Sequence, residues 1–333
     1  MDPGTSRHSG GETVTRIGSR RHGGAAPSGP PASYLALAAS GELERRARAA
    51  VRTLASCTTC PRRCRVDRTA SPPAPPAVCG VGRLARVASA APHHGEEACL
   101  SGRRGSGTIF FASCNLRCVF CQNHAISQEP HAGARPVTAR ELAGMMLELQ
   151  RRGCHNVNLV TPSHVVPQLL EAVAIAAANG LRLPLCYNTS AYDALDSLAW
   201  LDGVVDIYMP DLKLWSAARS RRYLKAADYP EVARQAIRAM HGQVGDLVLD
   251  RDGIARRGLL VRHLVMPDSA ADSRAILEWL ASAISPVTWV NVMGQYRPAH
   301  RAGRCPELAV AVEQAAVRAL RAHAARLGLR LDR

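Results

Sequence analysis

Residues 108–121 read Thr-Ile-Phe-Phe-Ala-Ser-Cys-Asn-Leu-Arg-Cys-Val-Phe-Cys, an apolar run that leads into three closely spaced cysteines. The run at 108–112 is short, apolar and rich in β-branched and aromatic residues, which predicts a buried strand. Cys114, Cys118 and Cys121 then follow with C-x3-C-x2-C spacing. Thiolates are the soft ligands that hold iron–sulfur clusters. Three of them leave one iron of a four-iron cluster without a protein ligand, and an open position is typical of catalytic metal sites.

The motif, with the aromatic Phe120 before its last cysteine, resembles the signature of the radical S-adenosylmethionine (radical SAM) superfamily. Further stretches resemble one branch of it, the proteins related to the pyruvate formate-lyase activating enzyme, and occur in the same order. The resemblance spans roughly residues 55 to 325. The stretches that carry it are residues 105–111, 121–123, 187–190, 206–213 and 290–298.

The resemblance implies an enzyme with two cofactors. Cys114, Cys118 and Cys121 would hold a [4Fe-4S] cluster whose open iron is chelated by S-adenosylmethionine. An electron from a low-potential donor such as flavodoxin or ferredoxin would drive cleavage to a 5′-deoxyadenosyl radical, which abstracts hydrogen from a substrate. The branch suggests a glycyl-radical-type protein as substrate, and a small molecule or RNA is the alternative. The alternative for the motif is three buried or zinc-binding cysteines. The alternative for the protein is a non-catalytic iron–sulfur electron carrier or a metal-binding structural module, which would not cleave S-adenosylmethionine.

The composition predicts a soluble globular protein. Hydrophobic residues make up 47% of the 333 residues, and no apolar run reaches the roughly 18 residues that span a bilayer. The N-terminal stretch lacks the apolar core of a signal peptide. Most of the eleven cysteines are clustered at short spacings, which favours metal ligation over disulfides. We therefore expect a cytoplasmic protein that does not contact a membrane, and the resemblance implies that it is an oxidoreductase.

The net charge of +15 raises the question of nucleic-acid binding. The basic residues are nearly all arginines, dispersed along the chain and mixed with acids, and aromatic residues make up 4%. Base-stacking platforms need aromatic side chains, so a solvated charged surface is the better interpretation and a nucleic-acid partner is not expected.

The chain divides into three predicted regions: a disordered tail at 1–32, an N-terminal helix and cysteine-rich module at 33–106, and a partial barrel at 107–333. From residue 107 apolar strands alternate with amphipathic helices, which argues for a parallel sheet wrapped by helices. Six βα units agree with the open partial (β/α)6 barrel that the resemblance implies. The strands are predicted at 108–112, 156–160, 183–187, 204–209, 259–265 and 287–292, and the helices at 138–152, 167–178, 193–200, 230–241, 270–283 and 307–327.

Polar residues follow the predicted strands, where α/β barrels place their chemistry. Related enzymes carry Gly-Gly-Glu after the second strand, in contact with the amino group of S-adenosylmethionine. This chain departs from that pattern, and the hydroxyls of Thr161 or Ser163, or backbone carbonyls, would substitute. For each residue the alternative is a local role in packing or helix capping, and His164 is assigned equally to either. The candidate cofactor-binding residues are Phe120, against the adenine, and Asn123, Thr161, Asn188, Thr189 and Ser190.

Asp211 and Lys213 follow the fourth strand. In the activating-enzyme relatives an Asp-x-Lys at this place lies at the active site, where the acid helps to hold a monovalent cation. A lysine would suit a carboxylate as a point charge, and this chain has only one other lysine, Lys225. The alternative is a structural ion pair between the two residues. Further candidates are Arg262, His263, Gln295, Tyr296 and Arg297.

A second cysteine group, Cys57, Cys60, Cys64 and Cys79, has C-x2-C-x3-C spacing and a distant fourth member. Four thiolates can close a tetrahedral zinc site or hold an auxiliary iron–sulfur cluster, and the spacing does not decide between them. Cys99 could replace Cys79, and free thiols are the alternative. The isolated cysteines are expected to be core thiols: Cys154, Cys186 and Cys305.

Overall fold

The computed structural model describes residues 30–69, 77–129 and 133–332. Its centre is a 10-stranded, mostly parallel sheet that is not closed, with the order β10-β9-β8-β6-β5-β4-β2-β1-β3 and β7 paired to β8. The predicted α/β class and open sheet are confirmed. Each of the six predicted strands overlaps an observed parallel strand, and these lie side by side in chain order. They are β2 (Ser106–Phe111), β4 (Val157–Val160), β5 (Leu185–Thr189), β6 (Ile207–Pro210), β8 (Ala255–Leu264) and β9 (Trp289–Met293).

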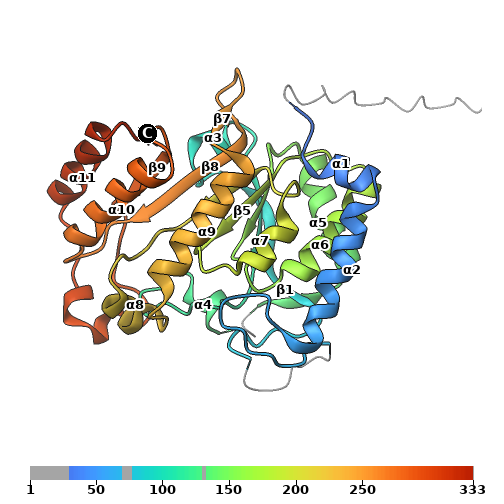
Figure 1. Ribbon diagram of the computed structural model, residues 1–333, viewed down its shortest axis with the longest axis horizontal. Helices are drawn as coiled ribbons and strands as arrows, with labels where there is room; N and C mark the ends of the chain where they lie inside the picture. The colour runs from blue at the N-terminus through green and yellow to red at the C-terminus, as the bar shows by residue number, and fades with distance from the viewer. Residues whose placement is uncertain (1–29, 70–76, 130–132, 333) are drawn as a thin grey trace, which may run out of the picture.

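Helices pack around the outside of the sheet, with α10 and α11 at one end and α2, α5 and α6 at the other (Figure 1). Their apolar stripes face the sheet because a strand with two buried faces must be covered on both sides. The predicted capping box is present, since the Glu141 amide donates to Thr138 Oγ1 at 3.2 Å. The long helices are α2 (Glu42–Arg52), α5 (Ala139–Arg151), α6 (Val166–Ala178), α9 (Tyr229–Val244), α10 (Ala270–Ala283) and α11 (Gln314–Arg326), and α7 (Leu195–Leu201) is a shorter one.

The last helix begins later than predicted. Residues 306–308 form a short 3-10 turn instead, and α11 starts only at Gln314. Glu307 contacts Tyr223 and Arg222. These tertiary contacts hold the segment that was predicted to be helical in a non-helical conformation. The other short elements are α1 (Tyr34–Ala39), η1 (Thr53–Ser56), α3 (Ala98–Ser101), α4 (His124–Ser127), α8 (Ala217–Leu224), η2 (Ala302–Arg304), η3 (Pro306–Leu308), β7 (Val248–Leu249) and β10 (Arg330–Leu331).

The sheet continues into the region assigned to the N-terminal module. Strand β1 (Ala85–His93) pairs antiparallel with β2, and β3 (Arg135–Val137) pairs antiparallel with β1. The alanine-rich sequence of β1 has weak β propensity, so pairing with a neighbour, and not local preference, fixes this strand. The predicted boundary after residue 106 thus falls at the first residue of β2, which pairs with His93 of β1.

Most of the predicted tail, residues 1–29, lies outside the described residues. The last residue of the predicted tail, Ala32, is buried and not disordered. The chain is anchored directly after it: the Ser33 amide donates to Asp206 Oδ1 at 2.8 Å, and the Tyr34 hydroxyl donates to the Leu183 carbonyl at 3.0 Å. Among the described residues, none of the helices combines the length and apolar character needed to cross a membrane.

Gly258→Ala is expected to destabilise the sheet by about 1–3 kcal/mol. Gly258 has a φ of 120°, and a Cβ there would lie 2.3 Å from the Asp246 carbonyl oxygen, so both the backbone and the neighbouring strand would shift. Gly144→Ala on α5 is the matched control: a Cβ there meets no atom within 4 Å, and alanine should stabilise the helix slightly. Urea unfolding of both variants measures the difference, and equal effects would contradict this account.

Candidate active site

A cavity of about 920 Å³ lies at the carboxyl ends of the parallel strands. In a parallel sheet these ends meet along one edge, so segments far apart in the sequence share one site. The structure brings all three cysteines of the C-x3-C-x2-C loop to this cavity. It also brings there the predicted residues Asn123, Thr161, Asn188, Thr189, Ser190, Asp211, Lys213, Arg262 and Gln295.

The cysteine loop is held by hydrogen bonds on both sides. Ser113 and Arg117 have left-handed backbones, with φ of 71° and 61°, which turn the chain sharply after β2. The Ser113 amide donates to the Ile126 carbonyl at 2.8 Å, and the Val119 amide donates to the Tyr223 carbonyl at 2.8 Å. Contacts with other parts of the chain therefore define the conformation of this loop.

The three thiols face a wide space. The Leu116 amide donates to Cys114 Sγ at 3.3 Å, and Cys121 Sγ lies 3.2 Å from Ser127 Oγ. Burial raises the pKa of the Cys114 and Cys118 thiols, so a positively charged partner is needed to hold them as thiolates. In the part of the chain that the structure describes, no group of three or more His, Cys, Asp or Glu side chains is arranged to hold a metal ion. Thiols spread around a roomy cavity suit a multi-iron cluster better than one ion.

Two of the predicted hydroxyl groups, those of Ser163 and Thr189, already make hydrogen bonds within the protein. Ser163 Oγ and Thr189 Oγ1 lie 2.8 Å apart, and Thr189 donates to Asp193 Oδ2 at 2.6 Å. The Ser190 hydroxyl is buried and has no hydrogen-bond partner among the described residues. Thr161 reaches the cavity because its backbone is left-handed, with φ of 61°. Ser190 and Thr161 are thus the hydroxyls left for a ligand at this edge.

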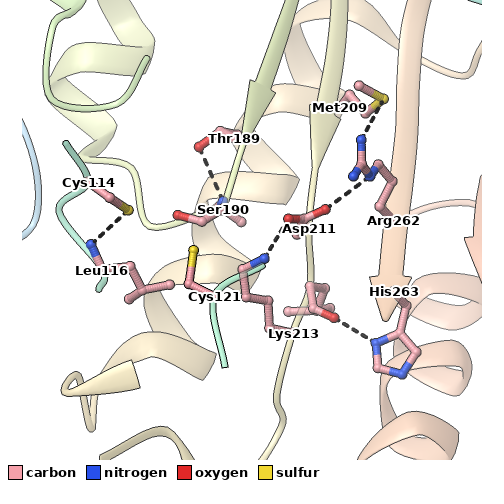
Figure 2. Close-up of polar contacts among 12 residues, drawn as sticks. Cys114, Leu116, Cys121, Thr189, Ser190, Met209, Asp211, Lys213, Arg262 and His263 are labelled. Carbon is pink, nitrogen blue, oxygen red and sulfur yellow. Dashed lines mark hydrogen bonds and ion pairs between the residues drawn. The ribbon is translucent and has the colours of Figure 1, made fainter. Parts of the chain in front are cut away.

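An ionic network forms the wall next to the cysteines (Figure 2). Lys213 Nζ lies 2.5 Å from Asp211 Oδ2, and Arg262 Nε lies 3.2 Å from Asp211 Oδ1. Burial opposes ionisation of Asp211, but the two cations outweigh it and its pKa is lowered. Burial also opposes the charge of Lys213, and Asp211 outweighs it, so the pKa of Lys213 is raised. All three groups are therefore charged at neutral pH.

Two acids that the sequence did not single out complete the network. Glu96 Oε2 lies 3.3 Å from Arg262 Nη1, and Glu97 Oε1 accepts a hydrogen bond from Asn291 at 2.9 Å. Burial raises the pKa of Glu96. Both acids precede α3, next to the unpredicted strand β1, so nothing in the sequence placed them here. Asn291 lies in the stretch 290–298, which carries part of the family resemblance. That stretch was the signal in the sequence that could have pointed to this contact.

Tyr229 is a further residue that the sequence did not indicate. Its hydroxyl donates to the Asp211 carbonyl at 2.8 Å and accepts from the Lys213 amide at 2.9 Å. His263 supports the same segment, with Nδ1 2.7 Å from the Leu212 carbonyl oxygen and Nε2 2.8 Å from Ser273 Oγ. These buried groups fix the backbone that carries the Asp-x-Lys pair.

Some predicted residues do not line the cavity. Phe120 is 5% exposed and packs near Tyr296, with ring centroids 6.4 Å apart, so it lies in the core and not against the cavity. His164 is buried with Nε2 3.0 Å from the Ala112 carbonyl oxygen, which makes it a support for the start of the cysteine loop. The residues outside the lining are Phe120, Ser163, His164, His263, Tyr296 and Arg297.

The second cysteine group lines a small cavity of about 10 Å³, separate from the first. Its lining includes Cys57, Cys60, Cys64 and Cys79. The alternative fourth member, Cys99, lies instead in a core cluster with Cys186. Of the expected core thiols, Cys154 and Cys186 are buried and Cys305 is half-buried.

Comparison with known proteins gives distant similarities. No family model matches the chain. An uncharacterized protein of Methanocaldococcus jannaschii, MJ0674, is 30% identical over 223 residues, which are 65% of this chain and 60% of that protein. The chain thus spans less than two thirds of that relative.

Two crystal structures of Streptococcus suis SuiB are similar at 10% identity. The one bound to the precursor peptide SuiA has a TM-score of 0.45 and matches 67% of this chain and 47% of SuiB. The one bound to S-adenosylmethionine has a TM-score of 0.46 and matches 66% and 48%.

Asp211→Asn is expected to lower the free energy of unfolding at pH 7 by up to about 3 kcal/mol, because it leaves two half-buried cations without their shared carboxylate. The lowered pKa of Asp211 means that its contribution is complete above the value of about 3.9 for an unfolded aspartate. It is lost as the pH falls through the folded value. The difference in stability between the wild type and the variant should therefore begin to shrink below about pH 4.

Urea unfolding at pH 7 and at pH 3.5 measures this difference. Asp252→Asn is the control, because Asp252 is exposed in the turn before β8. A destabilisation of Asp211→Asn no larger than that of the control at pH 7 would show that the network does not stabilise the fold.

Proposed function

We propose that this protein is a radical SAM enzyme that cleaves S-adenosylmethionine reductively and abstracts hydrogen from a substrate. One observation carries the proposal: three thiols of a single loop face the same cavity as the polar side chains at the ends of the parallel strands. Three thiolates leave an open metal position, and the cavity provides the space for a ligand to occupy it.

Cys114, Cys118 and Cys121 are the proposed ligands of a [4Fe-4S] cluster. Its fourth iron would face the cavity, since the described lining contains no further cysteine. When bound and reduced, the cluster supplies the electron that converts S-adenosylmethionine to methionine and a 5′-deoxyadenosyl radical. The hydrogen bond from the Leu116 amide to Cys114 Sγ stabilises negative charge on the sulfur, as such bonds do in iron–sulfur proteins.

The binding of S-adenosylmethionine is assigned to the polar wall. Asn188 and the unpartnered Ser190 hydroxyl lie at the end of β5 and are proposed to bind the ribose or the carboxylate. Lys213, charged and adjacent to the cysteines (Figure 2), is proposed to bind the carboxylate or to set the charge at the cluster. Asn123 and Thr161 complete the site. A volume of about 920 Å³ lies at the upper end of the 300–1,000 Å³ typical of small-molecule sites.

The proposed substrate is a protein or peptide segment of the glycyl-radical type, and this rests on the sequence resemblance to the activating-enzyme branch. A small molecule or RNA is the second candidate class. The groups proposed to meet the substrate are the other charged side chains that line the cavity: Glu96, Glu97 and Arg262. Activation of a glycyl-radical protein in vitro, detected as a glycyl radical by electron paramagnetic resonance, separates the two classes.

A cluster-bearing electron carrier is the alternative from another class. It requires a reducible cluster and nothing more. The buried network of Asp211, Lys213 and Arg262 beside the thiols would then have only a structural role, whereas an enzyme uses such charges to orient a charged ligand. This difference favours the enzyme.

Cys118→Ala is expected to abolish the formation of 5′-deoxyadenosine. The full chain is reconstituted anaerobically with iron and sulfide, reduced with dithionite and incubated with S-adenosylmethionine, and 5′-deoxyadenosine and methionine are measured. Cys154→Ala, which removes a buried thiol outside both cysteine groups, is the control and should retain cleavage. The electron-carrier alternative would be supported if the wild-type protein binds and reduces its cluster but forms no 5′-deoxyadenosine, with or without a peptide of the proposed substrate class.

The proposed electron donor is an acidic low-potential carrier such as flavodoxin or ferredoxin. A cavity of about 250 Å³ lies behind the cysteine loop and is lined by Leu116, Arg117 and Val119 of that loop. Arg62, Lys225 and Arg301 also line it, and none of its described lining residues is acidic. Such a basic surface attracts an acidic protein and increases the rate of encounter.

Lys225→Glu/Arg301→Glu is expected to slow cleavage driven by reduced flavodoxin by about tenfold or more at low salt. Both side chains are exposed, and cleavage driven by dithionite should be unchanged because it needs no docking. Arg140→Glu/Arg274→Glu is the control with the same change in net charge. If the control slows the flavodoxin reaction equally, the effect is one of net charge and the docking surface lies elsewhere.

A further inference from the structure

The second cysteine group contains a buried positive charge that has no carboxylate partner among the described residues. Arg68 is 1% exposed, and its guanidinium makes one side-chain hydrogen bond, from Nη1 to Cys57 Sγ at 3.3 Å. Its Nε and Nη2 atoms are buried and have no hydrogen-bond partner among the described residues. A buried charge of this kind is costly unless an opposite charge compensates it.

The groups nearest to Arg68 that can carry negative charge are thiols. Arg68 lines the same small cavity as Cys57, Cys60, Cys64 and Cys79, and no acidic residue is among the described residues that line it. Arginine in this position matches a site with several thiolates. It does not match four neutral thiols, which would leave its charge uncompensated.

The backbone around these cysteines is constrained in the way a metal knuckle requires. The Cys57 amide donates to the Val66 carbonyl at 3.0 Å, and the Arg65 amide returns a bond to the Cys57 carbonyl at 2.9 Å. Arg63 and Arg65 have left-handed backbones with φ of 41° and 55°. Each such non-glycine residue costs about 1 kcal/mol or more, so the loop needs a compensating interaction.

We propose that Cys57, Cys60, Cys64 and Cys79 bind one zinc ion as four thiolates, with the Arg68 guanidinium compensating the negative charge of the site. Four thiolates and one Zn²⁺ carry a net charge of −2, which Arg68 reduces to −1. The cavity of about 10 Å³ holds roughly one water-sized body, which favours a single ion over a cluster of several irons. Tetrahedral sites with four cysteine ligands are typical of structural zinc.

Binding completes an arrangement that the thiols have not yet reached. None of the described cysteine groups is already arranged around a metal ion, and Zn–S bonds of about 2.3 Å require the four sulfurs to converge. Metal binding of this kind contributes directly to the stability of the fold.

The proposed zinc site lies directly behind the loop that carries Cys114. Asn115, the next residue, lines the small cavity, and Arg62 Nε donates to the Asn115 carbonyl at 2.8 Å. With four protein ligands the ion has no open position for a substrate. Its role is therefore to hold the segment against which the cysteine loop packs, and it does not depend on the function proposed above.

Metal analysis of the full chain, purified anaerobically, tests the proposal. The wild type is expected to contain about one zinc per chain, and Cys57→Ser/Cys79→Ser should contain at least about fivefold less. Cys305→Ser, a half-buried cysteine that lines neither cavity, is the control and should retain zinc. Zinc that persists in the double variant, or iron and sulfide that disappear from it instead, would overturn the proposal.

Two further measurements cover the case in which the double variant does not fold. Cobalt added to the metal-free wild type should produce thiolate-to-metal absorption bands, and their absence would overturn the proposal without any variant. Arg68→Met should weaken zinc binding by about 10–100-fold in competition with a chelator, with Arg68→Lys partly restoring it and Arg52→Met, on the exposed side of α2, unchanged. Equal affinity in Arg68→Met and the wild type would remove Arg68 from the site.

Discussion

The parallel pairing of six consecutive strands is the constraint on which the rest of the structure depends. Because β2, β4, β5, β6, β8 and β9 run in the same direction and lie in chain order, every segment that leaves a carboxyl end arrives at the same edge. The cysteine loop after β2 and the Asp-x-Lys pair after β6 are about a hundred residues apart in the sequence, yet they line one cavity.

The ionic network depends on that geometry. Asp211 lies where β6 meets β8, in a parallel bridge with Arg262, so one carboxylate serves two cations that come from adjacent strands. Burial penalises each of these charges, and the site is stable only because the charges are close and fixed. Tyr229 and His263 hold the backbone in place. A ligand with both positive and negative groups, such as an amino acid, is suited to a wall of this composition.

The sequence predicted the repeating part of the structure well. Apolar runs and helix caps have short-range causes, and all six parallel strands and the capping box at Thr138 were found from them. Strand β1 was missed because its alanine-rich sequence has weak β propensity and its pairing with β2 is decided by tertiary contacts. With β1 unplaced, Glu96 and Glu97 could not be assigned to the cavity. Phe120 was predicted to contact the adenine because of its place in the cysteine motif. In the structure its side chain lies in the core near Tyr296.

The two cysteine groups differ in the size of the cavity they line and in their charged neighbours, and these differences indicate different roles for the same residue type. The first group faces a cavity of about 920 Å³ that Lys213 and Asp211 also line. The Ser190 hydroxyl in the same lining has no hydrogen-bond partner among the described residues. The second surrounds about 10 Å³ and is backed by the buried Arg68. An open thiolate site invites exchange with a ligand, whereas a closed one with its charge compensated favours permanent occupation. Because Asn115 lies between the two groups, the closed site would fix the position of the open one, and a rigid support for a reactive metal centre is what precise catalysis requires.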